Sequence, residues 1–361
     1  MFQDKDINYM SIALELAEKG RGLTSPNPLV GAVVVKNGMI AGKGFHVKAG
    51  LDHAEINALR EAGEKTQNAD LYVTLEPCGH YGKTPPCAEA IIKSGIGRVF
   101  TAMVDPNPLV NGGGINRLKE KKIITTVGIL EEKAKRLNED YIKFITTGTP
   151  FVTLKLALTA DGKIADLSGK SKWITGGETR KFVHFLRSVN DAVMVGEKTV
   201  IADNPTLNVR DDAGKNPLRI IVCSELNFSP DSNIFFDKNV ILAVTDKTEK
   251  KKIEIFSRKG IEIIEFASEN GMIPLKLLMK KLGERNIVSV LCEGGSSLAS
   301  SLINEKAADK IILTVAPKIM GKGLEPFPGL ENPGLENAVK LKNVEYKNID
   351  DDLIITGYPN L

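Results

Sequence analysis

Short apolar runs alternate with amphipathic stretches over the first part of the chain. Three apolar runs have the length and composition of buried strands: residues 30–35, 69–75 and 97–104. Three stretches have helical periodicity: residues 53–64, 87–96 and 131–145. The last of these predicts one continuous helix that closes this part of the chain. The alternation predicts a sheet with helices on its faces.

A second series of strands and helices follows residue 150. Its strand-like runs are residues 150–159, 191–196, 217–224, 239–245, 261–266, 287–295 and 309–316. A last run, residues 352–358, predicts a strand that returns along an edge of the sheet. Between the two series, residues 146–150 have the Thr, Gly and Pro composition of a linker. We therefore expect two α/β domains, residues 1–147 and residues 148–361.

Length and charge agree with a soluble two-domain protein. A chain of 361 residues exceeds what one hydrophobic core usually serves. Hydrophobic residues make up 42% and charged residues 26%, a composition of globular proteins and not of disordered or membrane proteins. The formal net charge is only +3. We therefore expect no nucleic-acid-binding surface, although a local basic pocket for a phosphate is compatible with this balance.

The N-terminal segment lacks the pattern of a secretory signal, because Asp4 and Asp6 stand where a signal peptide has basic residues. No apolar run is long enough to span a bilayer. We therefore expect a cytoplasmic protein that binds no membrane, and we expect it to assemble as a homo-oligomer.

The four cysteines fall into two environments. Cys223 and Cys292 lie inside apolar strand-like runs, where a buried thiol is the ordinary interpretation. Cys78 and Cys87 lie in polar segments rich in Pro and Gly. In a reducing compartment this position favours a metal ligand or a catalytic group over a disulfide.

The strongest chemical signal is the combination of the motifs H-A-E, E-P-C and P-P-C, which contain His53, Cys78 and Cys87. One imidazole and two thiolates are a typical ligand set for a catalytic zinc, which keeps a fourth position open. His53 and Cys87 each open a predicted helix, and the positive end of a helix favours a thiolate. Glu55 is near enough to take a proton from the water that such a metal activates and to pass it to a leaving amine.

This order of motifs resembles the zinc-deaminase signature H-x-E followed by P-C-x-x-C, in which water attacks a nucleobase-like ring. One difference is that eight residues, not two, separate Cys78 from Cys87. The alternative is a closed structural zinc site with His80 as the fourth ligand. That arrangement would leave Glu55 without a chemical role and zinc without an open position.

The second domain contains weaker signals. It has no G-x-G-x-x-G fingerprint, and the G-K-S at residues 169–171 lacks the first glycine of a P-loop, because Ile164 stands there. A better phosphate candidate is the turn at residues 294–297, which follows an apolar strand and leads into a helix-like run. A plain strand-to-helix turn without a ligand explains the same pattern.

Several segments resemble the bifunctional riboflavin-biosynthesis deaminase/reductase family: TSPNPLVGAVVV, GFHVKAGLDHAEINAL, TLEPCGHYGKTPPCAEAI and DPNPLVNGGG. The loop GHYGKTPP between the cysteines separates that family from cytidine, guanine and tRNA adenosine deaminases. The reductase half is matched by VTLKLALTADGKIA, SKWITG, VGEKTVIADNPTLNVR and EGGSSL. The resemblance covers nearly the whole chain. It implies a cytidine-deaminase-like α/β/α first domain with a mixed sheet and a dihydrofolate-reductase-like α/β second domain.

The resemblance implies hydrolytic deamination of 2,5-diamino-6-ribosylamino-4(3H)-pyrimidinone 5′-phosphate. Reduction of the ribosyl group by NADPH would then give 5-amino-6-ribitylaminouracil 5′-phosphate. Zn²⁺ and NADPH would be the cofactors, and the partner would be a small molecule. In the deaminase half, His53, Cys78 and Cys87 would hold zinc while Glu55 shuttles protons. The substrate pocket would contain Asn27, His46, Lys83, Asp105 and Asn107.

In the reductase half, the resemblance implies that catalysis rests on Lys155, near the reacting carbon, and on Glu293. NADPH would contact Ala157, Trp173, Thr199, Asp203, Ser224, Gly294, Gly295, Ser296 and Ser297. The ribosyl phosphate would contact Ser171, Arg187, Leu207, Arg210 and Glu293, and two guanidinium groups suit a dianionic phosphate. Because side chains alternate along a strand, we expect Lys155 to face the cofactor cleft together with Thr153 and Ala157.

The sequence leaves some points open. Asn204 stands where the family often has Asp, and either Lys155 or Glu293 could act as the acid in reduction. Two other interpretations compete with the one above. The first is a zinc deaminase for guanine or a nucleoside fused to an unrelated second domain, against which the long cysteine loop and the reductase motifs argue. The second is a zinc-stabilised regulatory protein derived from an inactive enzyme, against which the complete set of chemical residues argues.

Overall fold

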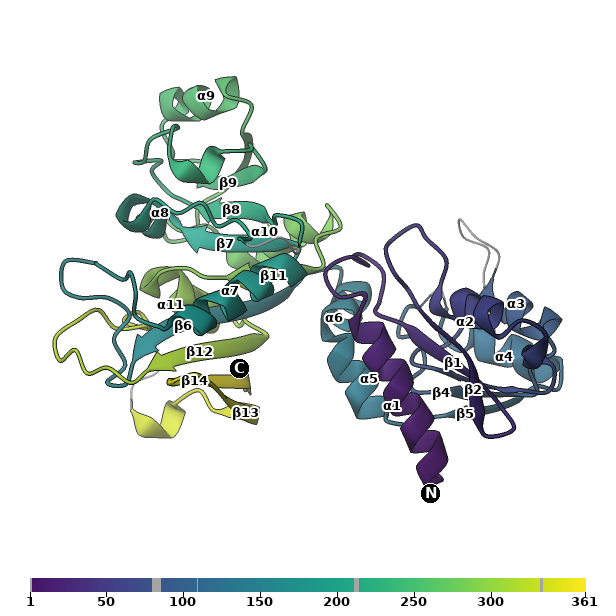
Figure 1. The fold of residues 1–361 in the computed structure, drawn as a ribbon. Coiled ribbons are helices and arrows are strands. Elements are labelled where there is room, and N and C mark those ends of the chain that lie inside the picture. The colour runs from purple at the N-terminus through teal and green to yellow at the C-terminus, as the bar shows by residue number, and fades with distance from the viewer. Residues whose placement is uncertain (1, 80–85, 109, 211–213, 332–333) are drawn as a thin grey trace. The chain divides into compact units, whose positions relative to one another are not determined.

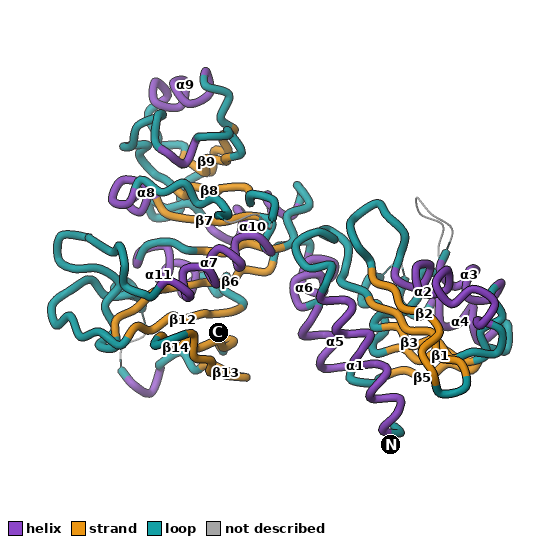
Figure 2. Tube along the Cα trace, in the orientation of Figure 1, coloured by secondary structure: helices purple, strands orange, loops and turns teal. Residues whose placement is uncertain are grey.

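The structure is a computed structural model that describes residues 2–79, 86–108, 110–210, 214–331 and 334–361. It divides into two compact units, Met1–Gly148 and Thr149–Leu361. Each unit has its own sheet and its own hydrophobic cores, and each is described by itself. The course of the chain can be followed in Figure 1, and its helices and strands in Figure 2.

The described residues of the first unit form a five-stranded sheet in the order β2-β1-β3-β4-β5. Its strands are β1 Gly31–Lys36, β2 Met39–Phe45, β3 Asp70–Val73, β4 Arg98–Thr101 and β5 Ile124–Val127. β1 pairs antiparallel with β2 and β3, whereas β3 with β4 and β4 with β5 are parallel. Side chains of β1 and β3 are almost all buried, because helices cover both faces of a sheet of this kind.

Two layers of helices enclose this sheet (Figure 1). The first four helices are α1 Asp4–Glu18, α2 Ala54–Ala62, α3 Cys87–Lys93 and α4 Gly113–Glu120, with a 3₁₀ turn at Gly63–Thr66. On one face, Met10 of α1 packs in a core with Val33 of β1. On the other face, Ala58 of α2 and Ile91 of α3 pack in a second core with Val34. The unit is therefore an α/β/α sandwich around a mixed sheet.

The helix that the pattern predicts over residues 131–145 is in fact two helices, α5 Glu131–Leu137 and α6 Glu139–Thr147. Asn138 lies between them with φ −113° and ψ 26°. Its buried side chain accepts a hydrogen bond from the Leu29 N–H at 2.7 Å and donates one to the Leu29 carbonyl at 3.0 Å. The prediction of one continuous helix is wrong, because these two bonds hold Asn138 outside the helical conformation.

The described residues of the second unit form a nine-stranded sheet in the order β10-β9-β8-β7-β11-β6-β12-β14-β13. Its strands are β6 Phe151–Thr159, β7 Ala192–Gly196, β8 Leu218–Val222, β9 Val240–Thr245, β10 Glu262–Phe266, β11 Ser289–Cys292, β12 Lys310–Ala316, β13 Leu341–Ile349 and β14 Asp352–Pro359. All neighbouring strands from β10 to β12 in the sheet order pair in parallel. β14 pairs antiparallel with β12, and β13 pairs antiparallel with β14. Parallel strands bring their carboxyl ends to one edge, where ligands of open α/β sheets bind.

Helices again cover both faces of the sheet (Figure 2). They are α7 Gly177–Val189, α8 Glu197–Asp203, α9 Lys250–Arg258, α10 Leu275–Gly283 and α11 Ser296–Asn304, with 3₁₀ turns at Asn233–Phe235 and Leu335–Asn337. Leu278 of α10 and Leu302 of α11 pack in one core with Val152. Phe256 of α9 packs in a core on the other face with Val193. This architecture confirms the α/β class expected for both parts of the chain.

Edge strands account for the differences from the predicted strands. The run at residues 352–358 does form a strand, β14, but its predicted place at the sheet edge is wrong, because β13 pairs with it from outside. Sequence analysis assigned no strand to β13, β2 or β5. All three lie at a sheet edge and leave most side chains exposed or half-buried. They therefore lack the apolar run by which a buried strand is found.

None of the helices in the described parts of the chain has both the length and the apolar composition needed to cross a membrane.

Candidate active sites

The first candidate site is the cluster of His53, Cys78 and Cys87. The ligand atoms of these three residues all lie within 4.8 Å of one another. His53 Nδ1 is 3.2 Å from the Sγ of Cys87 and 3.8 Å from the Sγ of Cys78. Donors on a tetrahedral zinc, with bonds of about 2.0–2.3 Å, are about 3.5 Å apart. The donor types and their spacing therefore fit a zinc ion held by one imidazole and two thiolates.

The fold brings the three residues together, and two of them lie at helix N-termini, as the sequence indicated. His53 is the N-terminal cap of α2, and Cys87 is the first residue of α3. Cys78 follows β3 and accepts a hydrogen bond from the Cys87 backbone N–H at 3.2 Å. The hydrogen bond from the Cys87 thiol, assisted by one from His53, lowers the pKa of Cys78 below the usual thiol range. Cys78 is therefore suited to thiolate ligation, whereas the thiol that donates this bond, Cys87, has a raised pKa as long as it keeps its proton.

Glu55 lies in the first turn of α2 beside this cluster and is only 3% exposed. Burial raises the pKa of its carboxyl to about 7, although the nearby His53 opposes this effect. Cys87 contacts the Glu55 carboxylate through a side-chain hydrogen bond. A carboxyl with a pKa near neutrality can both accept and return a proton under physiological conditions.

Two of the expected pocket residues, Asn27 and His46, form a pair near His53. Asn27 Nδ2 and His46 Nε2 are 3.1 Å apart, and His46 Nδ1 is 3.2 Å from the backbone carbonyl of Asp52. The ring of His46 meets the ring of His53 edge-on, with centroids 5.4 Å apart. Burial lowers the pKa of His46, so its imidazole is neutral at pH 7. The structure therefore brings both residues to the metal cluster.

Asp105 and Asn107 follow β4, and their loop is fixed by residues that sequence analysis missed. The Asp105 carboxylate accepts hydrogen bonds from the Asn107 backbone N–H at 2.9 Å and from the Tyr141 hydroxyl at 3.0 Å. Tyr141 is buried in α6. In the sequence it is only one apolar position of an amphipathic helix, so nothing there indicates this contact. Lys83 and the alternative zinc ligand His80 lie outside the described residues.

The second candidate site is a cavity of about 770 Å³ in the second unit. It opens at the carboxyl ends of β7, β8 and β11, where an open parallel sheet binds its ligands. The expected site residues that line it are Lys155, Ala157, Ser171, Trp173, Arg187, Thr199, Asp203, Leu207, Ser224, Glu293, Gly295, Ser296 and Ser297. Gly294 and Arg210 are not among the lining residues, and Arg210 is exposed.

Lys155, Arg187 and Glu293 form a charged group in this cavity. Arg187 donates to both carboxylate oxygens of Glu293, from Nε at 2.5 Å and from Nη2 at 3.0 Å. Burial opposes the charge of Glu293, but Arg187 and Lys155 hold the pKa of Glu293 below its usual value. Burial lowers the pKa of Lys155, an effect that Glu293 opposes and Arg187 reinforces. The Arg187 guanidinium thus contacts Glu293 at the wall of the cavity, and its contact with the ribosyl phosphate stays a prediction.

Lys155 lies on β6, and Lys155, Leu156 and Ala157 of this strand all line the cavity. Thr153 is on the same face of the strand but is buried and does not line the cavity. On the opposite wall, Ser171 Oγ donates to the Asp203 carboxylate, 3.1 Å from each oxygen. This bond joins a residue expected to contact substrate to one expected to contact NADPH.

The glycine turn before α11 has two different requirements. A Cβ on Gly294 would lie 2.8 Å from the backbone of Val195 on β7, so close strand packing demands glycine there. Gly295 has φ +67°, a conformation that glycine adopts without strain. The first turn of α11 has no side-chain cap, and Ser296 and Ser297 line the cavity. Its backbone N–H groups are thus positioned to meet an anionic ligand.

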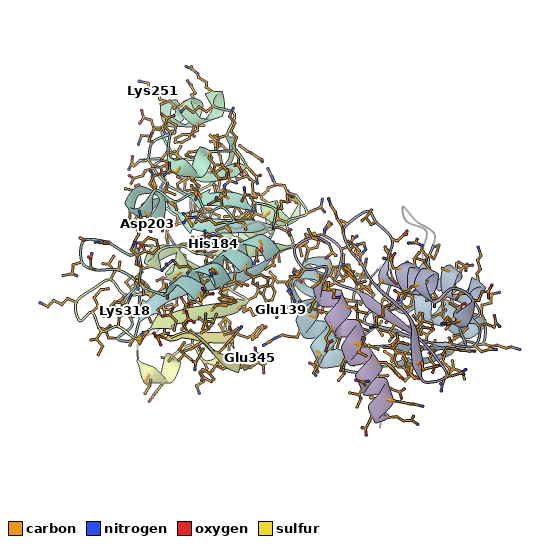
Figure 3. All side chains as sticks on the ribbon, viewed as in Figure 1. Glu139, His184, Asp203, Lys251, Lys318 and Glu345 are labelled. Atoms are coloured by element: carbon orange, nitrogen blue, oxygen red, sulfur yellow. The ribbon has the colours of Figure 1, made fainter. Side chains whose placement is uncertain are left out.

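Trp173 is held at the cavity by residues that the sequence did not single out. The residue is 63% exposed, and the centroid of its ring lies 4.3 Å from the Arg180 guanidinium. Its φ of +70° is strained for a bulky residue. Lys318, labelled in Figure 3, donates from Nζ to the carbonyls of Trp173 and Ile174, each at 2.7 Å. Lys318 and Arg180 therefore fix a loop that their positions in the sequence do not reveal.

Comparison with known proteins gives matches to both halves of the chain. Residues 3–103 match the family described as cytidine and deoxycytidylate deaminase zinc-binding region, and residues 150–355 match the RibD C-terminal domain. The riboflavin biosynthesis protein RibD of Aquifex aeolicus is 46% identical over 356 residues, which cover 98% of this chain and 99% of that protein. The RibD of Escherichia coli is 38% identical over 370 residues, covering 97% and 98%.

Solved structures are similar over the same extent. RibD of Acinetobacter baumannii aligns with a TM-score of 0.88 and 36% identity, covering 99% of each chain. A diaminohydroxyphosphoribosylaminopyrimidine deaminase/5-amino-6-(5-phosphoribosylamino)uracil reductase from Thermotoga maritima aligns with a TM-score of 0.86 and 38% identity, covering 98% of this chain and 99% of that one.

Proposed function

Because the chain belongs to the RibD family of bifunctional enzymes, with a zinc deaminase domain and an NADPH-dependent reductase domain, we propose which of its residues carry each activity. Residues 1–147 carry the deaminase and residues 148–361 the reductase. The substrate is 2,5-diamino-6-ribosylamino-4(3H)-pyrimidinone 5′-phosphate. Its deaminated product is then reduced at the ribosyl group. The observation that carries the proposal is the ligand set of His53, Cys78 and Cys87 beside a buried carboxyl.

In the deaminase half, zinc held by His53, Cys78 and Cys87 would supply a water molecule of lowered pKa as the nucleophile. Glu55 accepts the proton of that water and delivers it to the amino group, which leaves as ammonia. The pKa of about 7 at Glu55 supports both steps. Asn27 and Asp105 offer an amide and a carboxylate that can hydrogen-bond the edge of the pyrimidine ring.

In the reductase half, bound NADPH would supply a hydride to the ribosyl carbon once the sugar ring has opened to an imine. Arg187 holds Glu293 as a carboxylate. Lys155 is then the better proton donor of the two, because Glu293 has no proton to give at neutral pH. We therefore assign Lys155 as the acid and Glu293 as the group that orients it. The Ser171–Asp203 bond links a proposed substrate contact to a proposed NADPH contact.

The proposal includes a cytoplasmic, self-associating enzyme that acts on a small molecule. The composition supports the first point, and β13, which lies at the end of the nine-stranded sheet formed by the described residues, offers an edge through which two copies extend their sheets. Light scattering on the purified protein would give the oligomeric state directly.

A crossed pair of variants tests the assignment of the two halves. We would incubate the purified protein with the diaminopyrimidinone substrate, with and without NADPH, and identify products by mass. Glu55→Ala is expected to abolish deamination, retain zinc and still reduce the deaminated intermediate when it is supplied. Lys155→Ala is expected to deaminate normally and fail to reduce. Retained deamination in Glu55→Ala, or normal reduction in Lys155→Ala, would contradict the corresponding role.

A further inference from the structure

Glu76 is a buried carboxylate between β3 and the zinc ligand Cys78, and the mechanism above gives it no role. Its backbone N–H donates to the Met103 carbonyl at 3.0 Å, which continues the pairing of β3 with β4. The residue is only 3% exposed. A carboxylate is costly to bury unless its oxygens are fully hydrogen-bonded. The partners of this side chain therefore indicate what it does.

Four backbone N–H groups, all from one segment, donate to the Glu76 carboxylate. One oxygen accepts from Asp105 at 3.2 Å and from Gly112 at 2.9 Å. The other oxygen accepts from Gly114 at 3.0 Å and from Ile115 at 3.1 Å, in the first turn of α4. Among the described residues, no Lys, Arg or His forms an ion pair with it. The negative charge is balanced by peptide N–H groups and by the positive end of α4.

The Glu76 carboxylate joins the two ends of one loop. The N–H groups of Asp105 and Gly112 bind the same oxygen, so one atom ties together the two ends of the segment that carries Asn107. The described part of this segment, residues 105–108 and 110–112, is called the recognition loop below. The second oxygen fastens the same segment to the start of α4.

The main chains of the two segments are in direct contact. A Cβ on Gly114 would lie 1.7 Å from the Pro77 carbonyl oxygen, and one on Gly79 would lie 2.9 Å from the backbone carbon of Gly113. The start of α4 thus rests directly on the main chain that carries Cys78. Glu76 joins the segment of a zinc ligand to the segment of Asp105 and Asn107.

We propose that Glu76 is a positioning residue for substrate recognition in the deaminase, acting through the recognition loop and not through the metal. This inference rests on the proposed function, in which Asp105 of this loop binds the pyrimidine ring, and on the place in the substrate pocket that the family resemblance implies for Asn107. A carboxylate is required because all four partners are donors. In Glu76→Gln, an NH₂ group replaces one carboxylate oxygen. An NH₂ group cannot accept hydrogen bonds from the two N–H groups that it faces, so two of the four bonds are lost.

The test uses the full-length, zinc-loaded enzyme and steady-state deamination of the diaminopyrimidinone phosphate. Glu76→Gln is expected to raise KM by at least about tenfold, with a smaller change in kcat, because two hydrogen bonds to a charged group are lost. Zinc content is expected to stay at one per chain, and reduction of the deaminated intermediate to stay unchanged. Glu76→Asp, which keeps the charge, is expected to raise KM less.

Glu89→Gln is the matched control. Glu89 forms an ion pair with Arg117 between α3 and α4, close to the same helix but outside the recognition loop. Its loss is expected to change KM by less than about twofold. An equal rise of KM in Glu89→Gln and Glu76→Gln would overturn the proposal. Both rises would then result from a less stable α4 and not from the position of the recognition loop.

A double-variant cycle with Asn107→Ala separates this inference from the proposed function. If Glu76 acts through Asn107, Glu76→Gln adds little to the KM of the Asn107→Ala enzyme, whereas independent effects multiply. An unchanged KM in Asn107→Ala alone would refute the proposed role of the loop. A raised KM in Asn107→Ala with normal KM in Glu76→Gln would refute the positioning role. Loss of zinc or of folding in both Glu76 variants would also refute it, since Glu76 would then support the metal ligands.

Discussion

The ion pair of Arg187 and Glu293 gives a prediction about stability whose size can be worked from the structure. The two side chains are only 15% and 7% exposed and share a bidentate contact. Removing one partner of a buried pair costs about 3–5 kcal/mol, because the other charge is left uncompensated. Lys155 remains near Glu293, so we expect Arg187→Met to cost about 3 kcal/mol, the lower end of that range.

The assay is thermal unfolding followed by tryptophan fluorescence. Trp173 is the only tryptophan in the chain and lies in the second unit, so the signal reports that unit alone. For a unit of this size, about 3 kcal/mol corresponds to a fall in Tm of roughly 6–12 °C. The double variant Arg187→Met/Glu293→Gln is expected to recover most of this loss, because no buried charge of the pair remains.

The pH dependence has a definite sign. The pKa of Glu293 is lower than usual in the folded chain. Its charged form therefore stabilises the fold above the unfolded pKa, and this contribution is lost as the pH falls through the folded pKa. Arg187→Met removes the contribution. The gap in Tm between the native protein and Arg187→Met should accordingly be larger at pH 7 than at pH 4.

Arg258→Met on α9 is the control, because its ion pair with Glu254 is exposed at both side chains. We expect its effect to stay within about 0.5 kcal/mol. The reasoning fails if Arg187→Met is no more destabilising than Arg258→Met, or if the gap in Tm widens as the pH falls.

Three further outcomes are expected. Removal of zinc with a chelator should stop ammonia release and leave reduction of the deaminated intermediate intact, and added zinc should restore the first activity; loss of both activities would contradict separate sites. Residues 1–147 alone should bind zinc and deaminate, whereas residues 1–137 should keep the zinc-binding groups but fail to deaminate, because they lack Asn138 and Tyr141; equal deaminase activity of the two fragments would refute the role of these residues. Lys318→Met should raise the KM for NADPH several-fold, by about 1 kcal/mol, since an exposed lysine then no longer holds the Trp173 loop. Unchanged cofactor kinetics in that variant would show that the loop is fixed without it.

The sequence predicted most of the deaminase chemistry because its residues lie in short motifs. His53, Cys78 and Cys87, the proposed zinc ligands, are of distinctive residue types, and each lies at a feature that is visible locally: a helix start or a Pro-rich loop. The alternation of strands and helices likewise predicted two α/β units. Features that depend on a short local pattern can be predicted from a single sequence.

Other parts depended on contacts between distant segments. Asn138 breaks a helix only because it meets Leu29, and Tyr141 matters only because it meets Asp105. Nothing in the sequence indicated that Arg187 also pairs with Glu293, 106 residues later in the chain. The edge strands β2, β5 and β13 escaped prediction because few of their side chains are buried. The roles of Asn138 and Tyr141 depend on contacts with residues far away in the sequence, and a local pattern does not contain such contacts.

The bond between Asn138 and Leu29 spans 109 residues, and this separation matters during synthesis. A ribosome releases the chain from its N-terminus, and domains generally fold as units while the rest is still being made. The segment with all three zinc ligands emerges well before Asn138 and Tyr141. During that interval a nascent chain has its metal-binding groups but not the two side chains that secure the loops around them. Metal capture by the growing polypeptide could therefore precede formation of a closed pocket, so that the order of translation itself separates zinc loading from the onset of substrate binding.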